Sequence, residues 1–293
     1  MCGIVGIYLK SKKFEKSLGG MLSKMLVSME SRGPDSAGFA IYNSDKNKTY
    51  KYSICLNEMS FEKFKKEIKK KVKLINIEKN SDHVILKSIK KPHEILPILE
   101  SFVEISLVGY GKSIEIFKQV GNPKDVVERF NLKKLSGSHG IGHTRMATES
   151  AITTDGSHPY STGEDECLVH NGSLSNHNNL RRDLVKKGNL FKSENDTEVA
   201  AGYISRNLLN KKSLKETLTD GLNDLDGFYT FITGTKNGFA IVRDEIACKP
   251  AVVAETKDYV AIASEFQAMA NLPKVNSAKI FEPEPGVVYS WGN

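Results

Sequence analysis

The chain has 293 residues, of which 39% are hydrophobic and 26% charged, and its formal net charge is +7. This length suggests about two domains at roughly 150 residues each and is enough to bury a core without a disulfide or a metal. The apolar runs are far shorter than the ~18 residues that a membrane-spanning helix needs, and the amino terminus lacks the features of a signal peptide. We therefore expect a cytoplasmic protein without a membrane partner.

The first predicted elements lie before residue 45. Ile4–Leu9 is a continuous apolar run that predicts a buried strand, and Leu18–Met29 has apolar residues at helical spacing. Ser31–Asp35 contains a Gly-Pro pair and predicts a loop, after which Phe39–Tyr42 predicts a second buried strand.

Residues 46–135 are predicted to form a separate, lysine-rich α+β insertion. Its first half, residues 46–91, has 14 Lys against five acidic residues. A solvated helix face explains this excess, and a site for nucleic acid or an acidic partner is the alternative. Because Phe61–Val72 has Lys but no Arg, we favour the solvated face and do not expect a nucleic-acid partner. The elements predicted here are strands at Tyr50–Leu56 and His83–Ile89, helices at Phe61–Lys73, His93–Val103 and Pro123–Phe130, and a hairpin over Ile105–Val120.

Residues 136–293 mix strands with a few long helices, which favours α+β layers over a doubly wound parallel sheet. Strands are predicted at Gly140–Thr144, Glu166–Asn171, Phe228–Gly234, Phe239–Asp244, Val252–Glu255 and Tyr259–Ala263, and helices at Asn176–Lys187, Asp196–Leu209 and Leu214–Leu222.

Cys2 combines two reactive groups once Met1 has been removed, which a small second residue permits. An α-amine and a thiol ordinarily titrate at about pH 8, so one N-terminal Cys can supply both nucleophile and base. A Cys after Met also occurs by chance, but the strand directly behind it would fix the terminus in a sheet. The other cysteines lie far from it and from one another without CxxC spacing, which predicts neither a disulfide framework nor a zinc site.

Three further segments place polar groups where predicted strands or helices end. Arg145 can present a bidentate donor to a carboxylate, or it is a surface residue. Asn171 and Gly172 end a buried strand, where they form either a turn or an oxyanion hole. Asp196 begins an apolar helix, where it is either part of a cap or a ligand for an ammonium group.

Taken together, these segments resemble the class II glutamine amidotransferase domain, an N-terminal-nucleophile (Ntn) hydrolase. The resemblance implies an α+β fold, the Ntn-hydrolase αββα four-layer sandwich, with a small α+β insertion at 46–135 that interrupts an amidotransferase domain over 2–290. The motifs that carry it are Cys2–Ile7, Ser31–Gly38, Gly142–Thr148, Val169–Gly172 and Asn195–Glu198.

The resemblance also implies an enzyme that hydrolyses L-glutamine to glutamate and ammonia. Cys2 would attack the side-chain amide and form a thioester, while Asn171 and Gly172 would hold the oxyanion. The residues implied to bind the substrate are Arg145 for its α-carboxylate, Asp196 for its α-ammonium group, and Arg32 and Thr148 beside them.

The chain is most similar to free-standing amidotransferase subunits of the glutamate synthase and N-methylglutamate synthase type. This implies that ammonia passes in trans to a glutamate synthase-like flavoprotein subunit. Flavin and iron–sulfur clusters would then lie on partner subunits, and this chain would carry no cofactor and no metal. Two alternatives stay open, namely a self-contained hydrolase of another amide and a non-catalytic regulatory subunit.

Overall fold

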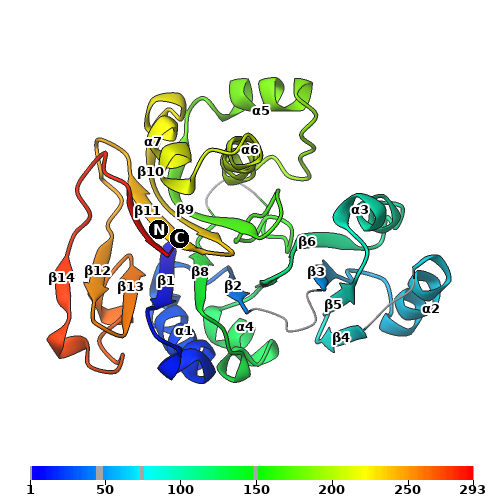
Figure 1. Ribbon diagram of the computed structural model, residues 1–293, viewed down its shortest axis with the longest axis horizontal. Helices are drawn as coiled ribbons and strands as arrows, with labels where there is room; N and C mark the ends of the chain where they lie inside the picture. Colours follow the sequence, from blue (N-terminus) through cyan, green and yellow to red (C-terminus); the bar gives the residue numbers. More distant parts are fainter. Residues whose placement is uncertain (1, 44–48, 73–75, 148–150, 293) are drawn as a thin grey trace.

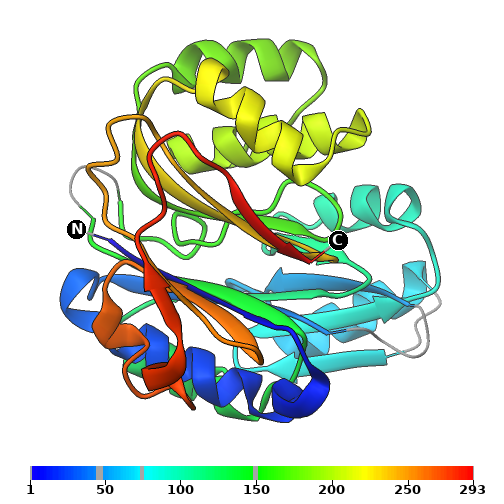
Figure 2. The same ribbon diagram turned by 60° about the vertical axis from the view of Figure 1, so that its left-hand side comes forward.

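The computed structural model describes residues 2–43, 49–72, 76–147 and 151–292. Two antiparallel β-sheets lie face to face, with helices on both outer sides (Figure 1, Figure 2). The α+β four-layer arrangement predicted from the sequence is therefore confirmed. No helix in the described ranges has both the length and the apolarity needed to cross a membrane.

The first sheet has seven strands, and α1 (Leu18–Val27) and α4 (Pro123–Arg129) pack against its outer face. Its strands, in order across the sheet, are β14 (Lys279–Phe281), β12 (Val252–Glu255), β13 (Tyr259–Ala263), β1 (Gly3–Leu9), β8 (His139–Arg145), β2 (Ser36–Tyr42) and β7 (Ile114–Val120).

The second sheet has four strands and is covered by three helices. The strands, in order, are β15 (Tyr289–Gly292), β11 (Gly238–Arg243), β10 (Gly227–Thr235) and β9 (Glu166–Leu174), and the helices are α5 (His177–Lys186), α6 (Asp196–Leu209) and α7 (Leu214–Asp224).

Strand β1 illustrates why its sequence is apolar without a break. Ile4 lies in the core between the two sheets, whereas Val5 and Ile7 lie in the core between the first sheet and its helices. A strand buried on both faces needs apolar side chains at successive positions, not alternate ones. The buried strand predicted at the amino terminus is confirmed, with Gly3 as its first residue.

The range 46–135 contains two structurally different parts. The first is a third sheet with α2 (Phe61–Lys71) and α3 (Pro92–Glu100) on one face, and its strands, in order, are β4 (Asn76–Asn80), β5 (His83–Ser88), β3 (Tyr50–Cys55) and β6 (Ser106–Gly111). The second part, β7 and α4, belongs to the seven-stranded sheet, because β7 pairs with β2 along its length and α4 packs beneath.

The hairpin predicted over Ile105–Val120 is wrong, because its two strands belong to different sheets. Strand β6 pairs with β3, whereas β7 pairs with β2, so the chain changes sheets between them. The carboxylate of Asp165 accepts hydrogen bonds from the backbone N–H groups of Lys112, Ser113 and Ile114 and fixes this crossing. Alternation and apolarity identify strands, but they do not say which strand is the neighbour.

The third sheet is joined to the first by a buried ion pair. Lys51 on β3 is 1% exposed, and its Nζ lies 2.8 Å from Oε1 of Glu115 on β7. Close by, the backbone N–H of Ile116 donates to the hydroxyl of Ser53 at 2.9 Å. These contacts connect the third sheet to β7, the edge strand of the seven-stranded sheet.

Replacing Lys51 with methionine should lower the free energy of unfolding by about 3–5 kcal/mol, because the Glu115 carboxylate is then buried without its partner. Urea denaturation followed by circular dichroism measures the change. The double variant Lys51→Met/Glu115→Leu should recover most of the loss, since an apolar pair leaves no buried charge. An equal loss in the single and double variants would contradict this explanation.

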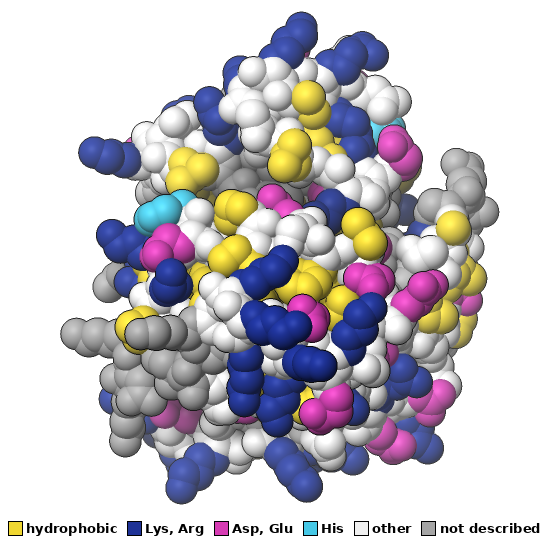
Figure 3. Space-filling model, turned by 90° about the vertical axis from the view of Figure 1, so that its right-hand side faces the viewer, with side chains coloured by type: hydrophobic (Ala, Val, Ile, Leu, Met, Phe, Trp, Pro, Cys, Tyr) yellow, Lys and Arg dark blue, Asp and Glu magenta, His cyan; other side chains and the backbone are white. Residues whose placement is uncertain are grey.

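Lys and Arg side chains gather on the face that carries the insertion (Figure 3). Helix α2 buries Phe64 and Ile68 and exposes lysines on its outer side. Lys63 is paired with Glu104 at 2.7 Å, which offsets part of the charge. This is the arrangement of an amphipathic helix with a solvated outer face.

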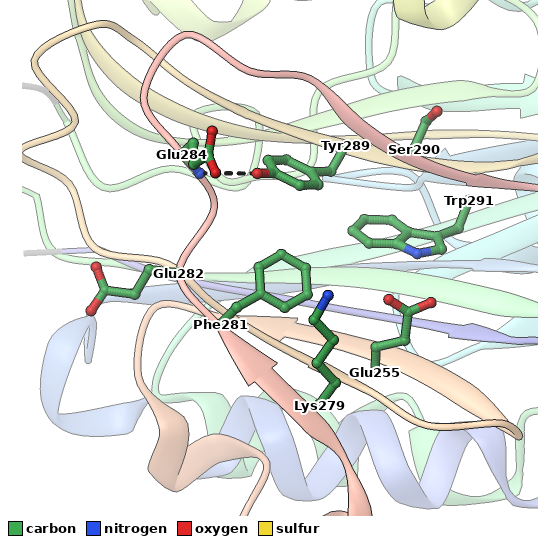
Figure 4. A pocket seen from close by; sticks show the side chains of 8 residues that line it. All are labelled: Glu255, Lys279, Phe281, Glu282, Glu284, Tyr289, Ser290 and Trp291. Carbon is green, nitrogen blue, oxygen red and sulfur yellow. Dashed lines mark hydrogen bonds between the residues drawn. The ribbon is translucent and has the colours of Figure 1, made fainter.

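At the opposite edge of the molecule, β14 and β15 flank a cavity of about 370 Å³ between the two sheets. The rings of Phe281, Tyr289 and Trp291 line it, and those of Phe281 and Tyr289 lie 5.6 Å apart (Figure 4). Trp291 is the one tryptophan of the chain, so its fluorescence reports on this edge of the sandwich.

Candidate active site

Cys2 lies directly before β1, where the sheet leaves little space. The strand begins at Gly3, which is opposite Thr144 of β8. A Cβ atom on Gly3 would lie 2.7 Å from Oγ1 of Thr144 and 2.8 Å from Cβ of Met29, so only glycine fits. The thiol of Cys2 is partly exposed and lies 4.0 Å from the carbonyl oxygen of Met146. Met1 lies outside the described residues.

Arg32 holds the backbone of Cys2 in place. Its Nε donates to the carbonyl oxygen of Cys2 at 3.0 Å, and its Nη1 lies 2.5 Å from Oε1 of Glu265. The third nitrogen, Nη2, is buried and has no partner among the described residues. The next residue, Gly33, has no room for a side chain, since a Cβ atom there would lie 2.3 Å from the carbonyl carbon of Thr144. Arg32 thus contacts the residue predicted to be the nucleophile and has one buried donor that no described residue binds.

Arg145 is the last residue of β8 and is 5% exposed. Its Nη1 donates to the carbonyl oxygen of Ala151 at 3.3 Å. The chain that follows is held by Asp35, whose Oδ2 accepts from the backbone N–H of Ala147 at 2.8 Å. Thr148, the remaining predicted substrate-binding residue, lies outside the described residues.

Asn171 and Gly172 lie inside β9 and do not form a turn. Gly172 is opposite Tyr229 of β10 and has a φ of 147°. A Cβ there would lie 2.0 Å from the carbonyl oxygen of Phe228, which explains the glycine. Asn171 is 3% exposed, and its Nδ2 has no hydrogen-bond partner in the described ranges. A buried amide donor without a partner is costly in a purely structural role.

Asp196 is the first residue of α6 and is anchored to β9. Asn195 caps the helix, since its Oδ1 accepts from the backbone N–H of Thr197 at 2.9 Å. The Oδ2 of Asp196 accepts from the backbone N–H of Leu174 at 2.9 Å, and its side chain is 19% exposed. The capping residue is therefore Asn195, and Asp196 keeps a partly exposed carboxylate at the end of β9.

A hydrogen bond between the sheets brings these groups to one end of the sandwich. His143, two residues before Arg145, donates from Nε2 to the carbonyl oxygen of His170 at 2.9 Å. His170 directly precedes Asn171, and its Nδ1 lies 2.9 Å from Oγ1 of Thr197 on α6. Burial lowers the pKa of His143 to about 3 and also lowers that of His170, so both rings are neutral near pH 7.

Three residues with evident positioning roles carried no signal strong enough to be singled out from the sequence. Glu265 pairs with Arg32 from a position 233 residues away. Asp35 lies inside the Ser31–Gly38 motif, but its role as an acceptor for Ala147 depends on the meeting of β2 and β8. His170 precedes the Asn-Gly pair, and its position between β8 and α6 follows from the fold alone.

A family description of a glutamine amidotransferase domain matches residues 143–271, which include Arg145, Asn171 and Asp196. The chain is also 50% identical over 295 residues to the glutamine amidotransferase-like protein GlxB of Rhizobium meliloti (strain 1021), with 99% of this chain and 98% of that protein covered. This chain belongs to the glutamine amidotransferase family. The predicted enzyme class is thereby confirmed.

A second relative is a putative glutamine amidotransferase of Methanothermobacter thermautotrophicus, 30% identical over 98% of each chain. Among solved structures, glutamine phosphoribosylpyrophosphate amidotransferase from B. subtilis matches with a TM-score of 0.65 at 21% identity. That match covers all of this chain and 47% of the other, and it bears on the fold alone. The predicted Ntn-hydrolase sandwich of this amidotransferase is confirmed, while the roles of its individual site residues stay predictions.

Proposed function

We propose that this chain hydrolyses L-glutamine to glutamate and ammonia through a thioester at Cys2. The observation that carries the proposal is the unpaired Nδ2 of Asn171, at the end of the sandwich that also bears Cys2, Arg145 and Asp196. A buried donor without a partner suits an oxyanion that exists only during the reaction. The backbone N–H of Gly172 would supply the second donor.

The first half of the reaction forms the thioester. As the sulfur of Cys2 attacks the carbonyl carbon of the side-chain amide, its proton passes to the α-amine of the same residue. The amine then gives a proton to the leaving nitrogen, the C–N bond breaks and ammonia departs. His143 is buried and its Nε2 donates to the carbonyl oxygen of His170, and burial lowers its pKa, so we assign the proton to the α-amine of Cys2 and not to this histidine.

The second half of the reaction releases glutamate. Water attacks the thioester carbon and gives a proton to the α-amine of Cys2, which passes it to the sulfur as the C–S bond breaks, so that the thiol and the free amine are both restored. The charges of Arg145 and Asp196 suit the α-carboxylate and α-ammonium groups of a free amino acid. Arg32, through its remaining donor, and Thr148 complete the proposed substrate contacts.

A glutaminase assay on the purified chain tests this proposal. Cys2-dependent release of equal amounts of glutamate and ammonia would support it. Faster cleavage of a bulky or acylated amide than of glutamine would favour a hydrolase of another substrate. Absence of any Cys2-dependent turnover, with and without companion proteins, would leave a non-catalytic subunit as the better description.

We further propose that the ammonia passes to a glutamate synthase-like flavoprotein subunit, which would carry the flavin and iron–sulfur clusters. The segments that support this are Gly142–Ala151 and Val169–His177, which resemble those of free-standing synthase subunits. Affinity purification from the native organism, with mass-spectrometric identification of the companions, tests it. A flavoprotein whose 2-oxo acid amination depends on this chain is the expected companion, and recovery of the chain without one would contradict the proposal.

Replacing Asp196 with asparagine should reduce selectivity for the α-amino group. The amide oxygen can still accept from the N–H of Leu174, so the helix stays in place while the negative charge is lost. The preference for glutamine over 4-carbamoylbutanoate, which lacks the α-amino group, should fall by roughly a hundredfold, mainly through KM. Steady-state kinetics with both substrates measures the ratio. An unchanged ratio would assign the ammonium group to another residue.

A further inference from the structure

Residues 151–159, called here the 151–159 loop, follow the segment after β8 and contact the site. The carbonyl oxygen of Ala151, at the start of the loop, accepts from Nη1 of Arg145 at 3.3 Å. A guanidinium group orients a carboxylate well only when it is itself held in place. The position of the 151–159 loop therefore bears directly on the direction in which Arg145 presents its donors.

Lys118, near the end of β7, holds the middle of this loop. Its Nζ donates to the carbonyl oxygens of Asp155 at 3.2 Å and Ser157 at 2.8 Å, and lies 4.7 Å from the ring centre of Tyr160. The side chain is 5% exposed, and burial lowers its pKa to about 8, so the ammonium group is still mostly charged at pH 7. A buried lysine is costly unless its charge is bound, and here backbone oxygens bind it.

Gly38 leaves room for the 151–159 loop to lie beside Lys118. It lies opposite Lys118 in the β2–β7 pair. A Cβ on Gly38 would lie 2.2 Å from the carbonyl oxygen of His158 and 2.5 Å from Cβ of Lys118. The last residue of the Ser31–Gly38 motif thus lets the loop rest directly on the first sheet.

The third sheet also contacts the 151–159 loop, through Ser106 on β6. The hydroxyl of Ser106, on β6, donates to Oδ2 of Asp155 at 3.1 Å, and Nδ2 of Asn57 donates to the hydroxyl of Ser106 at 3.0 Å. A cavity of about 350 Å³ lies between the insertion and α6, and Lys118 and Asp155 are among its lining residues. The loop is therefore held by β7 of the seven-stranded sheet and by β6 of the third sheet.

We propose that Lys118 is a positioning residue for glutamine binding: it fixes the 151–159 loop and, through the carbonyl of Ala151, aims Arg145 at the substrate α-carboxylate. The inference rests on the proposed glutaminase function. The same inference gives the third sheet a role in glutamine binding, since Ser106 on β6 holds the 151–159 loop at Asp155.

The test compares Lys118→Met with Lys192→Met, the same change at an exposed lysine that lines the same cavity. Lys118→Met should raise the KM for glutamine by roughly ten- to a hundredfold with kcat within about threefold, because misplaced binding groups chiefly weaken substrate capture. Lys192→Met should leave both constants unchanged, and Lys118→Arg should recover part of the loss.

A second measurement separates positioning of Arg145 from a general loss of structure. Wild-type enzyme should prefer glutamine to glutamine α-amide, which lacks the α-carboxylate, and Lys118→Met should reduce that preference. Ser106→Ala, a milder change, should shift KM in the same direction by a few-fold and serves if Lys118→Met does not fold. An unchanged KM and an unchanged preference in the folded variants would overturn the inference, whereas a wild type without Cys2-dependent glutaminase would instead overturn the proposed function.

Discussion

Replacing Cys2 with alanine is expected to reduce glutamate production from glutamine by roughly 10⁴- to 10⁶-fold, the loss typical of removing a covalent nucleophile. The reason is that the substitution removes the attacking sulfur from the residue directly before β1, whereas the α-amine, which alanine retains, cannot form the thioester. The thermal unfolding midpoint should change little, because the thiol is partly exposed and its hydrogen-bond contact with the described residues, to Met146, is long at 4.0 Å. Coupled glutamate detection together with differential scanning calorimetry checks both parts.

The chain provides a matched control in Cys248, which is also a free cysteine but is exposed and has no proposed part in the reaction. Cys248→Ala should keep full activity. Mass spectrometry of active protein should show a chain that begins at Cys2. Retention of Met1 in fully active enzyme, or full activity in Cys2→Ala, would contradict the mechanism.

Replacing Asn171 with alanine should lower kcat by about 10²–10³-fold while changing KM much less, because the lost donor acts on the oxyanion and not on bound glutamine. The structure adds an expectation about stability. Since Nδ2 has no partner within the described ranges, its removal forfeits no hydrogen bond from that atom, and the free energy of unfolding should not fall by the amount usual for a buried polar truncation.

Asn171→Asp is the sharper companion variant, because the side chain keeps its shape but places negative charge beside the oxyanion. It should be at least as inactive as Asn171→Ala. Single-turnover measurements of thioester formation would locate the loss in the chemical step. A normal rate of thioester formation in both variants would show that another group stabilises the oxyanion.

Local patterns were sufficient to predict much of the sandwich. The apolar run of β1 and the bounds of α6, which begins at Asp196, follow from periodicity and capping signals that act within one turn or strand. The fold also places Cys2 directly before β1, Arg145 at the end of β8 and Asp196 at the start of α6, while Asn171 lies inside β9.

What could not be predicted depends on contacts between distant segments. Strand β4, with the sequence Asn-Ile-Glu-Lys-Asn, is polar and mostly exposed, so its pairing with β5 defines it more than its residues do. The Asn-Gly pair at Asn171 ordinarily favours a turn, but pairing with β10 keeps it in a strand. The partners Glu265 and Lys118 act across 233 and about 40 residues, a distance at which no local pattern carries information.

The position of Cys2 directly before a central strand has a practical consequence for producing this enzyme. Any affinity tag or fusion partner joined ahead of that residue would convert its amine into a peptide nitrogen and would have to leave the sheet beside Met29 and Thr144. Recombinant protein should therefore carry its tag after β15, and preparations made with an uncleaved leader should appear well folded yet inert.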